Sequence, residues 1–255
     1  MTESKALWTP TRIVAGAVGV LAAVAIYLVG LPSSASVFGT ALSDLTVPTA
    51  LFVAGAVIAV VASTATATRW RVVDIVVASV LGVAGGLVFS VWNAGSAAFL
   101  NGAGPLVTAV IDGVWLFPAV LGALIVRRPG AAVYTELVAA VLSALVGNQW
   151  GFATVWYGLV EGLGAEVVFA LLLYRRYGFG TALLAGAGAG VAVGLLDVFT
   201  YYPELLDTGE RIAYLGIAVV SGAVIAGLGS WLLTRSLART GTLAPLASGR
   251  TAERV

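Results

Sequence analysis

Long apolar segments, separated by short polar breaks, run along most of this chain. Eight of them approach the ~20 residues that an α-helix needs to cross a bilayer. They cover residues 12–31, 48–68, 72–92, 105–126, 130–147, 152–174, 179–198 and 212–234. Turn-forming or charged residues fill the breaks, as in NAGS at 93–96 and RRPG at 127–130. The pattern predicts an all-α fold: a polytopic membrane helix bundle with eight transmembrane helices.

The composition agrees with a membrane location. Hydrophobic residues make up 60% of the 255 residues and charged residues only 10%, whereas soluble domains carry about 25% charged residues. Such a chain lacks the polar residues that would cover an apolar core in water. We therefore expect a multi-pass protein of the plasma membrane.

Positive charges lie in alternate breaks of this pattern. Twelve of the thirteen lysine and arginine residues precede the first span, follow the last one, or lie in every second break between them. Arg211 is the exception. Since cytoplasmic loops carry an excess of lysine and arginine, the distribution predicts that both termini are cytoplasmic. An alternative interpretation of the first span, as a signal peptide cleaved near SAS at 34–36, stays open.

Missing residue types exclude several classes of protein. The only lysine, Lys5, lies outside every span and no GxxxxGK[ST] motif occurs, so neither a P-loop ATPase nor a retinal Schiff base is expected. Without histidine or cysteine there is no Ser–His pair for proteolysis and no histidine or cysteine ligand for zinc or haem. A metal site made of carboxylates alone stays open, although the acids show no recognisable spacing for one. We expect no cofactor, no metal centre, no nucleic-acid partner and no enzyme activity; transfer chemistry based on carboxylates is the one class left formally open.

Four acidic residues interrupt the apolar spans: Asp112, Glu136, Glu161 and Glu166. A charge at mid-bilayer costs at least about 2.5 kcal/mol, and the spans that hold these acids contain no lysine or arginine. The acids are therefore protonated, hydrogen-bonded to a neighbouring helix, or facing a cavity that receives a cation. A further acid, Asp197, lies at the outer end of its span.

Depth along the helices separates these acids. At 1.5 Å per residue, Asp112 lies about 10 Å and Glu161 roughly 12–14 Å from the outer ends of their spans, while Glu166 and Glu136 lie past the midplane. Glu161 and Glu166 are also about 140° apart around one helix, so they cannot both face one ligand. We expect Glu161 to face a cavity open to the outside; a hydrogen bond to a neighbouring helix is the alternative for each acid.

Aromatic and amide residues cluster at the outer ends of the same spans. Together with the four acids they form the predicted ligand-binding set, to which they add Trp92, Asn93, Trp115, Asn148, Gln149 and Trp150. An interfacial aromatic belt accounts for tryptophan at this depth but not for the amides. Stacking on tryptophan, amide hydrogen bonds and one carboxylate suit a planar aromatic cation.

Small residues recur at four-residue spacing in several spans. Ala78, Gly82 and Gly86 do so in the third span, and the seventh and eighth spans hold similar stripes. Such a face lets two helix backbones approach closely. We predict that the stripe of the third span docks a partner subunit; packing within the chain is the alternative.

Several stretches of the chain, in combination, resemble a known family. RRPGAAVYTELVAAV at 127–141, VGNQWG at 146–151 and YGLVEGLGAEVVFALLLYRRYG at 157–178 look like the YkoE-type substrate-binding subunits of energy-coupling-factor transporters. The resemblance covers residues 69–237. It implies a six-helix vitamin-binding core that takes up thiamine or its hydroxymethylpyrimidine precursor. It also implies two kinds of partner, a transmembrane coupling subunit and ATP-binding-cassette ATPases.

The resemblance divides the chain into three expected parts. They are a two-helix transmembrane hairpin at 1–68, which is not recognised in the family, the core at 69–237, and a cytoplasmic tail at 238–255. The sequence also departs from the family at Glu161, where glutamine is common. Two other functions stay open: a standalone proton-coupled transporter or channel that uses Glu161 and Glu166, and a structural subunit of a membrane assembly.

Overall fold

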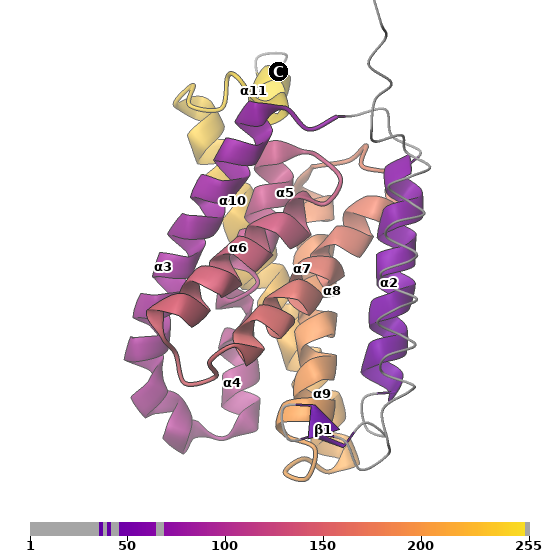
Figure 1. Ribbon diagram of the computed structural model, residues 1–255, viewed down its shortest axis with the longest axis vertical. Helices are drawn as coiled ribbons and strands as arrows, with labels where there is room; N and C mark the ends of the chain where they lie inside the picture. Colours follow the sequence, from indigo (N-terminus) through magenta and orange to yellow (C-terminus); the bar gives the residue numbers. More distant parts are fainter. Residues whose placement is uncertain (1–35, 38–39, 42–45, 65–68, 253–255) are drawn as a thin grey trace, which may run out of the picture.

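The computed structural model describes residues 36–37, 40–41, 46–64 and 69–252 (Figure 1). Its α-helices are α2 (Thr46–Thr64), α3 (Val72–Ala103), α4 (Pro105–Ile111), α5 (Phe117–Val126), α6 (Ala131–Val146), α7 (Ala153–Leu171), α8 (Phe179–Leu196), α9 (Thr208–Ser221), α10 (Gly229–Arg239) and α11 (Ala247–Ala252). A 3-10 turn, η2 (Asp112–Val114), and two π-helical segments, η3 (Asp197–Tyr201) and η4 (Gly222–Leu228), connect or extend them. β1 (Ser36–Val37) and β2 (Thr40–Ala41) form a short antiparallel pair. The described chain is therefore helical almost throughout.

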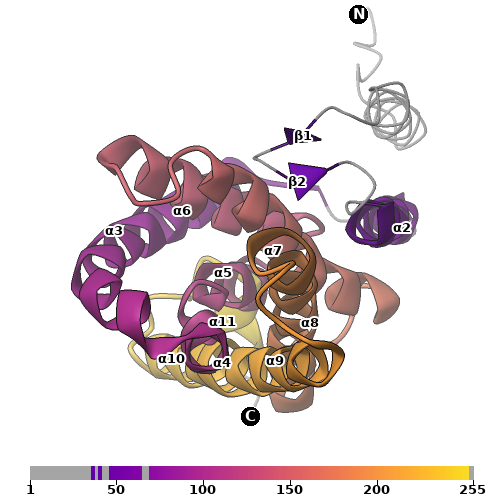
Figure 2. The same ribbon diagram turned by 90° about the horizontal axis from the view of Figure 1, so that it is seen from below.

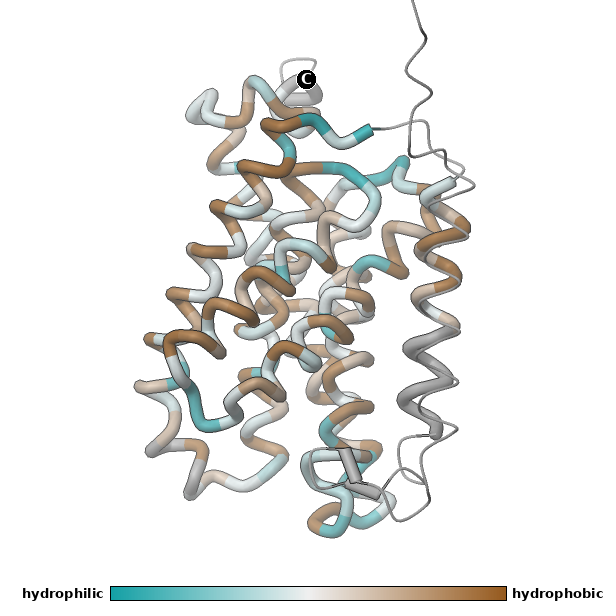
Figure 3. Tube along the Cα trace, viewed as in Figure 1, coloured by the Kyte–Doolittle hydropathy of each residue, from teal (hydrophilic) through white to brown (hydrophobic). Residues whose placement is uncertain are grey.

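Five helical segments are long and apolar enough to cross a membrane. They are Val72–Ala97, Pro105–Val126, Ala153–Leu171, Phe179–Tyr201 and Thr208–Arg239, and each coincides with a predicted span. Two shorter apolar helices, α6 and Ala54–Thr64 of α2, lie where two more spans were predicted. The first predicted span, 12–31, lies outside the described residues. Figure 3 shows mostly hydrophobic positions along the helices and many of the hydrophilic ones toward the two ends.

α5 lies at the centre of the bundle. Seen along the helices in Figure 2, it is surrounded by α3, α6 and α7 on one side and by α9 and α10 on the other. Every residue of α5 after Phe117 is buried, as expected for a helix that is apolar all round. α2 packs outside this bundle against α7, where a Cβ on Gly55 would lie 3.1 Å from the side chain of Val167.

α3 continues past the break predicted at NAGS, residues 93–96. The helix ends only at Ala103, before Gly104 adopts a φ of 76° and Pro105 begins α4. Asn93 does not compete for the backbone of its own helix, because its side chain bonds to groups on other segments. The prediction of a turn at this position was wrong.

The membrane segment formed by α4 and α5 is interrupted in the middle. Pro118 lacks the N–H that would continue a helix from the preceding turn, so α4 gives way to η2 and α5 begins at Phe117. Ser221 of α9 satisfies the backbone at this break. Its Oγ accepts from the N–H of Gly113 at 3.0 Å and donates to the carbonyl of Val110 at 2.7 Å. Irregular backbone at membrane depth is tolerated here because it is buried in protein.

The stripe of Ala78, Gly82 and Gly86 faces α6 of the same chain, which lies beside α3 in Figure 2. Ala78 is fully buried. A Cβ on Gly82 would lie 2.6 Å from that of Val138, and one on Gly86 would lie 2.7 Å from the carbonyl oxygen of Ala139. The structure therefore replaces the predicted docking role with packing inside the chain, because α6 already occupies this face.

The small-residue stripes of the last two spans pack against each other. A Cβ on Gly186 of α8 would overlap the carbonyl oxygen of Gly222, and one on Gly190 would overlap that of Ala218. Glycine at these positions brings the backbones of α8 and of the α9–η4 helix into direct contact.

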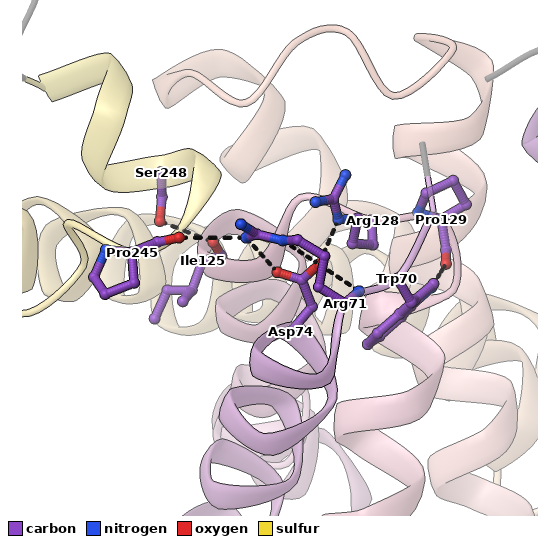
Figure 4. A network of polar contacts seen from close by, with 8 residues as sticks. All are labelled: Trp70, Arg71, Asp74, Ile125, Arg128, Pro129, Pro245 and Ser248. Carbon is purple, nitrogen blue, oxygen red and sulfur yellow. Dashed lines mark hydrogen bonds and ion pairs between the residues drawn. The ribbon is translucent and has the colours of Figure 1, made fainter. Parts of the chain in front are cut away.

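Arginines at one end of the bundle tie α3, the α5–α6 turn and the C-terminal segment together (Figure 4). Asp74 is fully buried and forms ion pairs with Arg71 at 2.7 Å and with Arg128 at 2.8 Å. The hydrogen bond from Arg71 to Asp74 raises the pKa of the arginine. Arg71 also donates to the carbonyl of Pro245, and Ser248 donates to the end of α5. The segment that follows α10 therefore folds back over the end of α5.

Replacing Asp74 by Asn is expected to destabilise the protein. The substitution removes the charge that two arginines share and leaves Arg128, whose side chain is 11% exposed, without a counter-ion. We expect the midpoint of thermal unfolding in detergent to fall by about 5–10 °C. Glu204→Gln, which alters an exposed acid at the opposite end of the bundle, is the control. Equal midpoints for the two variants would contradict a stabilising role of Asp74.

Candidate functional site

A layer of tryptophan and amide side chains joins three segments toward the end of the bundle away from the arginines. The indole N–H of Trp115 donates to Oδ1 of Asn93 at 2.9 Å. The Nδ2 groups of Asn93 and Asn148 both donate to Oγ of Ser143, each at 3.2 Å. These bonds fix the orientation of both amides and tie α3, the segment before α5, and α6 to one another.

Three tryptophan rings form one edge-to-face cluster beside this layer. The ring centroids of Trp92 and Trp115 are 6.3 Å apart, and those of Trp115 and Trp150 are 5.9 Å apart, with interplanar angles of 72° and 88°. Trp150 is held on two sides, because its backbone N–H donates to Oδ1 of Asn148 at 2.8 Å and its indole N–H donates to the hydroxyl of Tyr201 at 3.0 Å. The cluster offers apolar ring surface and fixed amides in one place.

Two buried aspartates lie where helices lose their α-helical pattern. Asp112 is the first residue of η2 and Asp197 is the first residue of η3. The hydroxyl of Tyr214, a fully buried residue, lies 2.6 Å from Oδ2 of Asp197 and 3.2 Å from Oδ2 of Asp112. A hydroxyl carries one proton and donates to one acceptor at a time. Tyr214 therefore donates to only one of the two carboxyls at a time.

Glu161 lies near this pair without a hydrogen-bond donor of its own. Its side chain on α7 is 5% exposed and is close enough to Glu136 and Asp197 to interact with their charges. In the described part of the chain no donor reaches its carboxylate, and both ion pairs there belong to Asp74. A buried acid that lacks both a donor and a base is well suited to receive a cationic ligand.

Glu166 and Glu136 accept hydrogen bonds from backbone N–H groups at the N-termini of neighbouring helices. The two carboxylate oxygens of Glu166 accept from the backbone N–H groups of Gly130 at 2.6 Å and Ala132 at 2.9 Å, at the start of α6. Oε2 of Glu136 accepts from the N–H of Ala119 at 2.8 Å, at the start of α5, while its Oε1 has no partner among the described residues. Carboxylates favour helix N-termini, where free N–H groups and the positive end of the dipole meet them. Glu166 thus makes the structural contact that the sequence left open as its alternative.

The set of residues predicted from the sequence and the cluster seen in the structure differ in a few members. Gln149 is exposed and takes no part in the hydrogen bonds of the tryptophan–amide layer. Ser143 and Tyr214 were missed, because a single hydroxyl in an apolar span produces no recognisable pattern. Asp197 was noticed only as an acid at a span end, and that acid in an apolar segment was the available signal.

A metal centre is not supported by the described residues. They contain no group of three or more histidine, cysteine, aspartate or glutamate side chains placed to hold a metal ion. Aromatic surface, oriented amides and acids without nearby bases together suit an organic cation with a flat ring.

Known proteins resemble the part of the chain that contains this cluster. The family described as "ABC-type cobalt transport system, permease component" matches residues 73–192. The chain is 34% identical over 181 residues to the HMP/thiamine permease protein YkoE of Bacillus subtilis (strain 168), which covers 71% of this chain and 91% of that protein. It is 33% identical to a solved structure described as an S-component of an ECF transporter, with a TM-score of 0.70, over 73% of this chain and 94% of that one.

Proposed function

Because the chain belongs to the YkoE family of S-components of energy-coupling-factor transporters, we propose that it binds thiamine or its hydroxymethylpyrimidine precursor and imports it. The observation that carries this proposal is Glu161, a buried acid with neither donor nor base, close to a pair of buried aspartates. Thiamine carries a positive charge and two flat rings, which match an acid and an aromatic cluster. The similarity to an HMP/thiamine permease supports the same ligand class.

The proposed ligand set is smaller than the one read from the sequence. We assign the rings of the ligand to Trp92, Trp115 and Trp150, its polar edge to Asn93 and Asn148, and its charge to Glu161. Asp112, Asp197 and Glu136 place further carboxyl groups close to Glu161. Glu166 is left out because both of its oxygens bind the backbone of α6, and Gln149 is left out because it is exposed.

The proposed topology has eight transmembrane helices with both termini in the cytoplasm. The arginines at the end drawn in Figure 4 support this orientation through the positive-inside rule. Residues 1–68 form an added hairpin, 69–237 the S-component core and 238–255 a cytoplasmic tail. The length of the relatives supports this division, since the two matches cover 71% and 73% of the chain.

The proposed partners are a transmembrane coupling subunit and ATP-binding-cassette ATPases. The chain has no P-loop of its own, so ATP-driven uptake has to draw its energy from another subunit. As a substrate-binding subunit, the chain performs no chemistry on its ligand.

Calorimetric titration of the purified protein tests the ligand class. We expect thiamine or hydroxymethylpyrimidine to bind with a stoichiometry near one, and cobalt ions to give no binding heat. Saturable cobalt binding without any vitamin binding would overturn the proposal. Labelled-vitamin uptake into liposomes that hold this chain alone is the second test, because concentrative uptake driven by a proton gradient would favour a standalone transporter.

A further inference from the structure

Glu161 lies beside a second buried acid, Glu136 of α6. A Cβ on Gly162, the residue that follows Glu161, would lie 3.1 Å from the Cβ of Glu136. Glu136 is fully buried, and its Oε2 already accepts from the N–H of Ala119 while its Oε1 has no partner among the described residues. Two carboxylates in such a place repel each other when both are charged, so they do not ionise independently.

Two aspartates lie close to Glu161 as well. One turn before Glu161, the hydroxyl of Tyr157 lies 3.2 Å from that of Thr200 in η3, the segment that begins at Asp197. Asp197 is linked in turn to Asp112, since both lie within hydrogen-bond distance of one tyrosine hydroxyl. The charges of both aspartates act on Glu161. Four carboxyl groups, from η2, α6, α7 and η3, therefore form one buried group, the carboxyl cluster.

The carboxyl cluster has no basic partner in the described part of the chain. Both ion pairs there belong to Asp74, at the arginine-rich end of the bundle. Arg211, near the start of α9, donates instead to the backbone carbonyls of Pro203 and Leu206. α2, α5 and α8 also pack against α7, and these three helices contain no titratable residue. Ionised carboxylates that lack both water and a base are unfavourable, and such groups take up protons instead.

Glu161 differs from the other three acids of the cluster in its contacts. Glu136 accepts from a backbone N–H at the start of α5. Asp112 and Asp197 both lie within reach of the hydroxyl of Tyr214. Such hydrogen bonds stabilise the charged form of a carboxyl, and Glu161 has none among the described residues. Its side chain is also 5% exposed, whereas Glu136 is fully enclosed, so Glu161 is the more accessible of these two to a ligand.

We propose that Glu161 carries a proton in the ligand-free protein and releases it when the thiamine cation binds. This inference rests on the proposed function and adds a proton exchange to it. The O–H bond of the carboxyl breaks, its electron pair stays on the carboxylate, and the proton passes to the solution. The buried site is neutral before and after the exchange, which avoids an uncompensated charge in either state. Hydroxymethylpyrimidine, which is neutral, leaves the proton in place.

Calorimetric titration of the full chain in buffers with different heats of ionisation tests the proposal. The slope of the observed heat against the heat of the buffer counts the protons that leave the protein. We expect about one proton for thiamine and about none for hydroxymethylpyrimidine. Protons compete with the cation, so thiamine binding should weaken by up to about tenfold for each pH unit that the solution is lowered, over roughly pH 8 to 6.5. Binding of hydroxymethylpyrimidine should stay level over the same range.

Two variants of α7 assign the proton to its residue. Glu161→Gln has no proton to release at this position, so the count for thiamine should fall to about zero, measured at concentrations that suit its weaker binding. Glu166→Gln, whose carboxylate binds the backbone of α6, should keep the wild-type count. Thiamine binding without proton release, equal release by the two ligands, or full release by Glu161→Gln would each overturn the inference and leave the proposed function standing. A protein that binds neither vitamin would overturn both.

Discussion

Glu161→Gln is expected to weaken thiamine binding by at least about 30-fold, the effect of losing ~2 kcal/mol from a buried charge pair. The substitution keeps the shape of the side chain and removes the one buried acid that has neither donor nor base in the described part of the chain. Hydroxymethylpyrimidine is neutral at pH 7, so its affinity should change by less than about threefold. Calorimetric titration of both ligands with the same preparation gives the comparison.

Glu166→Gln is the matched control on the same helix. Its carboxylate binds the backbone at the start of α6, so the variant should unfold at lower temperature but keep its affinity for thiamine. Asp112→Asn extends the test to the aspartate pair and should also weaken thiamine binding. If thiamine binds to the Glu161 and Asp112 variants as it does to the wild type, the acids are not the counter-ions of the ligand.

Gly82→Leu is expected to destabilise the folded protein by about 3 kcal/mol, because it overpacks the contact between α3 and α6. A Cβ at this position would lie 2.6 Å from the Cβ of Val138 and 2.9 Å from the carbonyl oxygen of Thr135. Backbone atoms cannot move aside as the end of a flexible side chain can, so the two helices have to separate. Low yield of monodisperse protein and an early unfolding transition in detergent are the expected results.

Gly102→Leu distinguishes this packing effect from the general effect of a leucine on α3. Its Cβ would meet nothing within 4 Å, so its stability should stay within about 1 kcal/mol of the wild type. Pull-down of the coupling subunit completes the experiment. A Gly82→Leu protein that is as stable as the wild type but no longer retains the coupling subunit would restore the docking role of the stripe.

The acids show where sequence reasoning stops. Their presence in apolar spans was visible directly, and the 140° between Glu161 and Glu166 correctly indicated that the two would face different surroundings. Which of the two glutamates binds the backbone of another helix depended on where the start of α6 lies relative to α7. No local sequence pattern encodes that distance. Asp112 and Asp197 are far apart in the chain, and only the packing of α9 between η2 and η3 places Tyr214 against both.

The glycine stripes likewise could be predicted only in part from the sequence. A four-residue spacing of small residues indicates that some helix approaches closely, since the spacing is a property of one helix. It does not indicate which helix, and for Ala78, Gly82 and Gly86 the answer is α6. The prediction of a turn at Asn93 was wrong for a related reason. The side chain of Asn93 forms its hydrogen bonds with Trp115 and Ser143 of other segments, so it does not interrupt α3.

The sequence by itself located the five membrane-length helices of the described residues, the end of the bundle that carries most of the arginines, and the family to which the chain belongs. Hydrophobicity and charge act residue by residue, and short motifs are continuous, so each is readable along the chain. Only the tertiary structure decided the partners of Glu136 and Glu166, the helix that packs on the glycine stripe, and the contacts of Tyr214 with Asp112 and Asp197. Those features depend on distances between helices, which arise when the whole bundle buries its surfaces together.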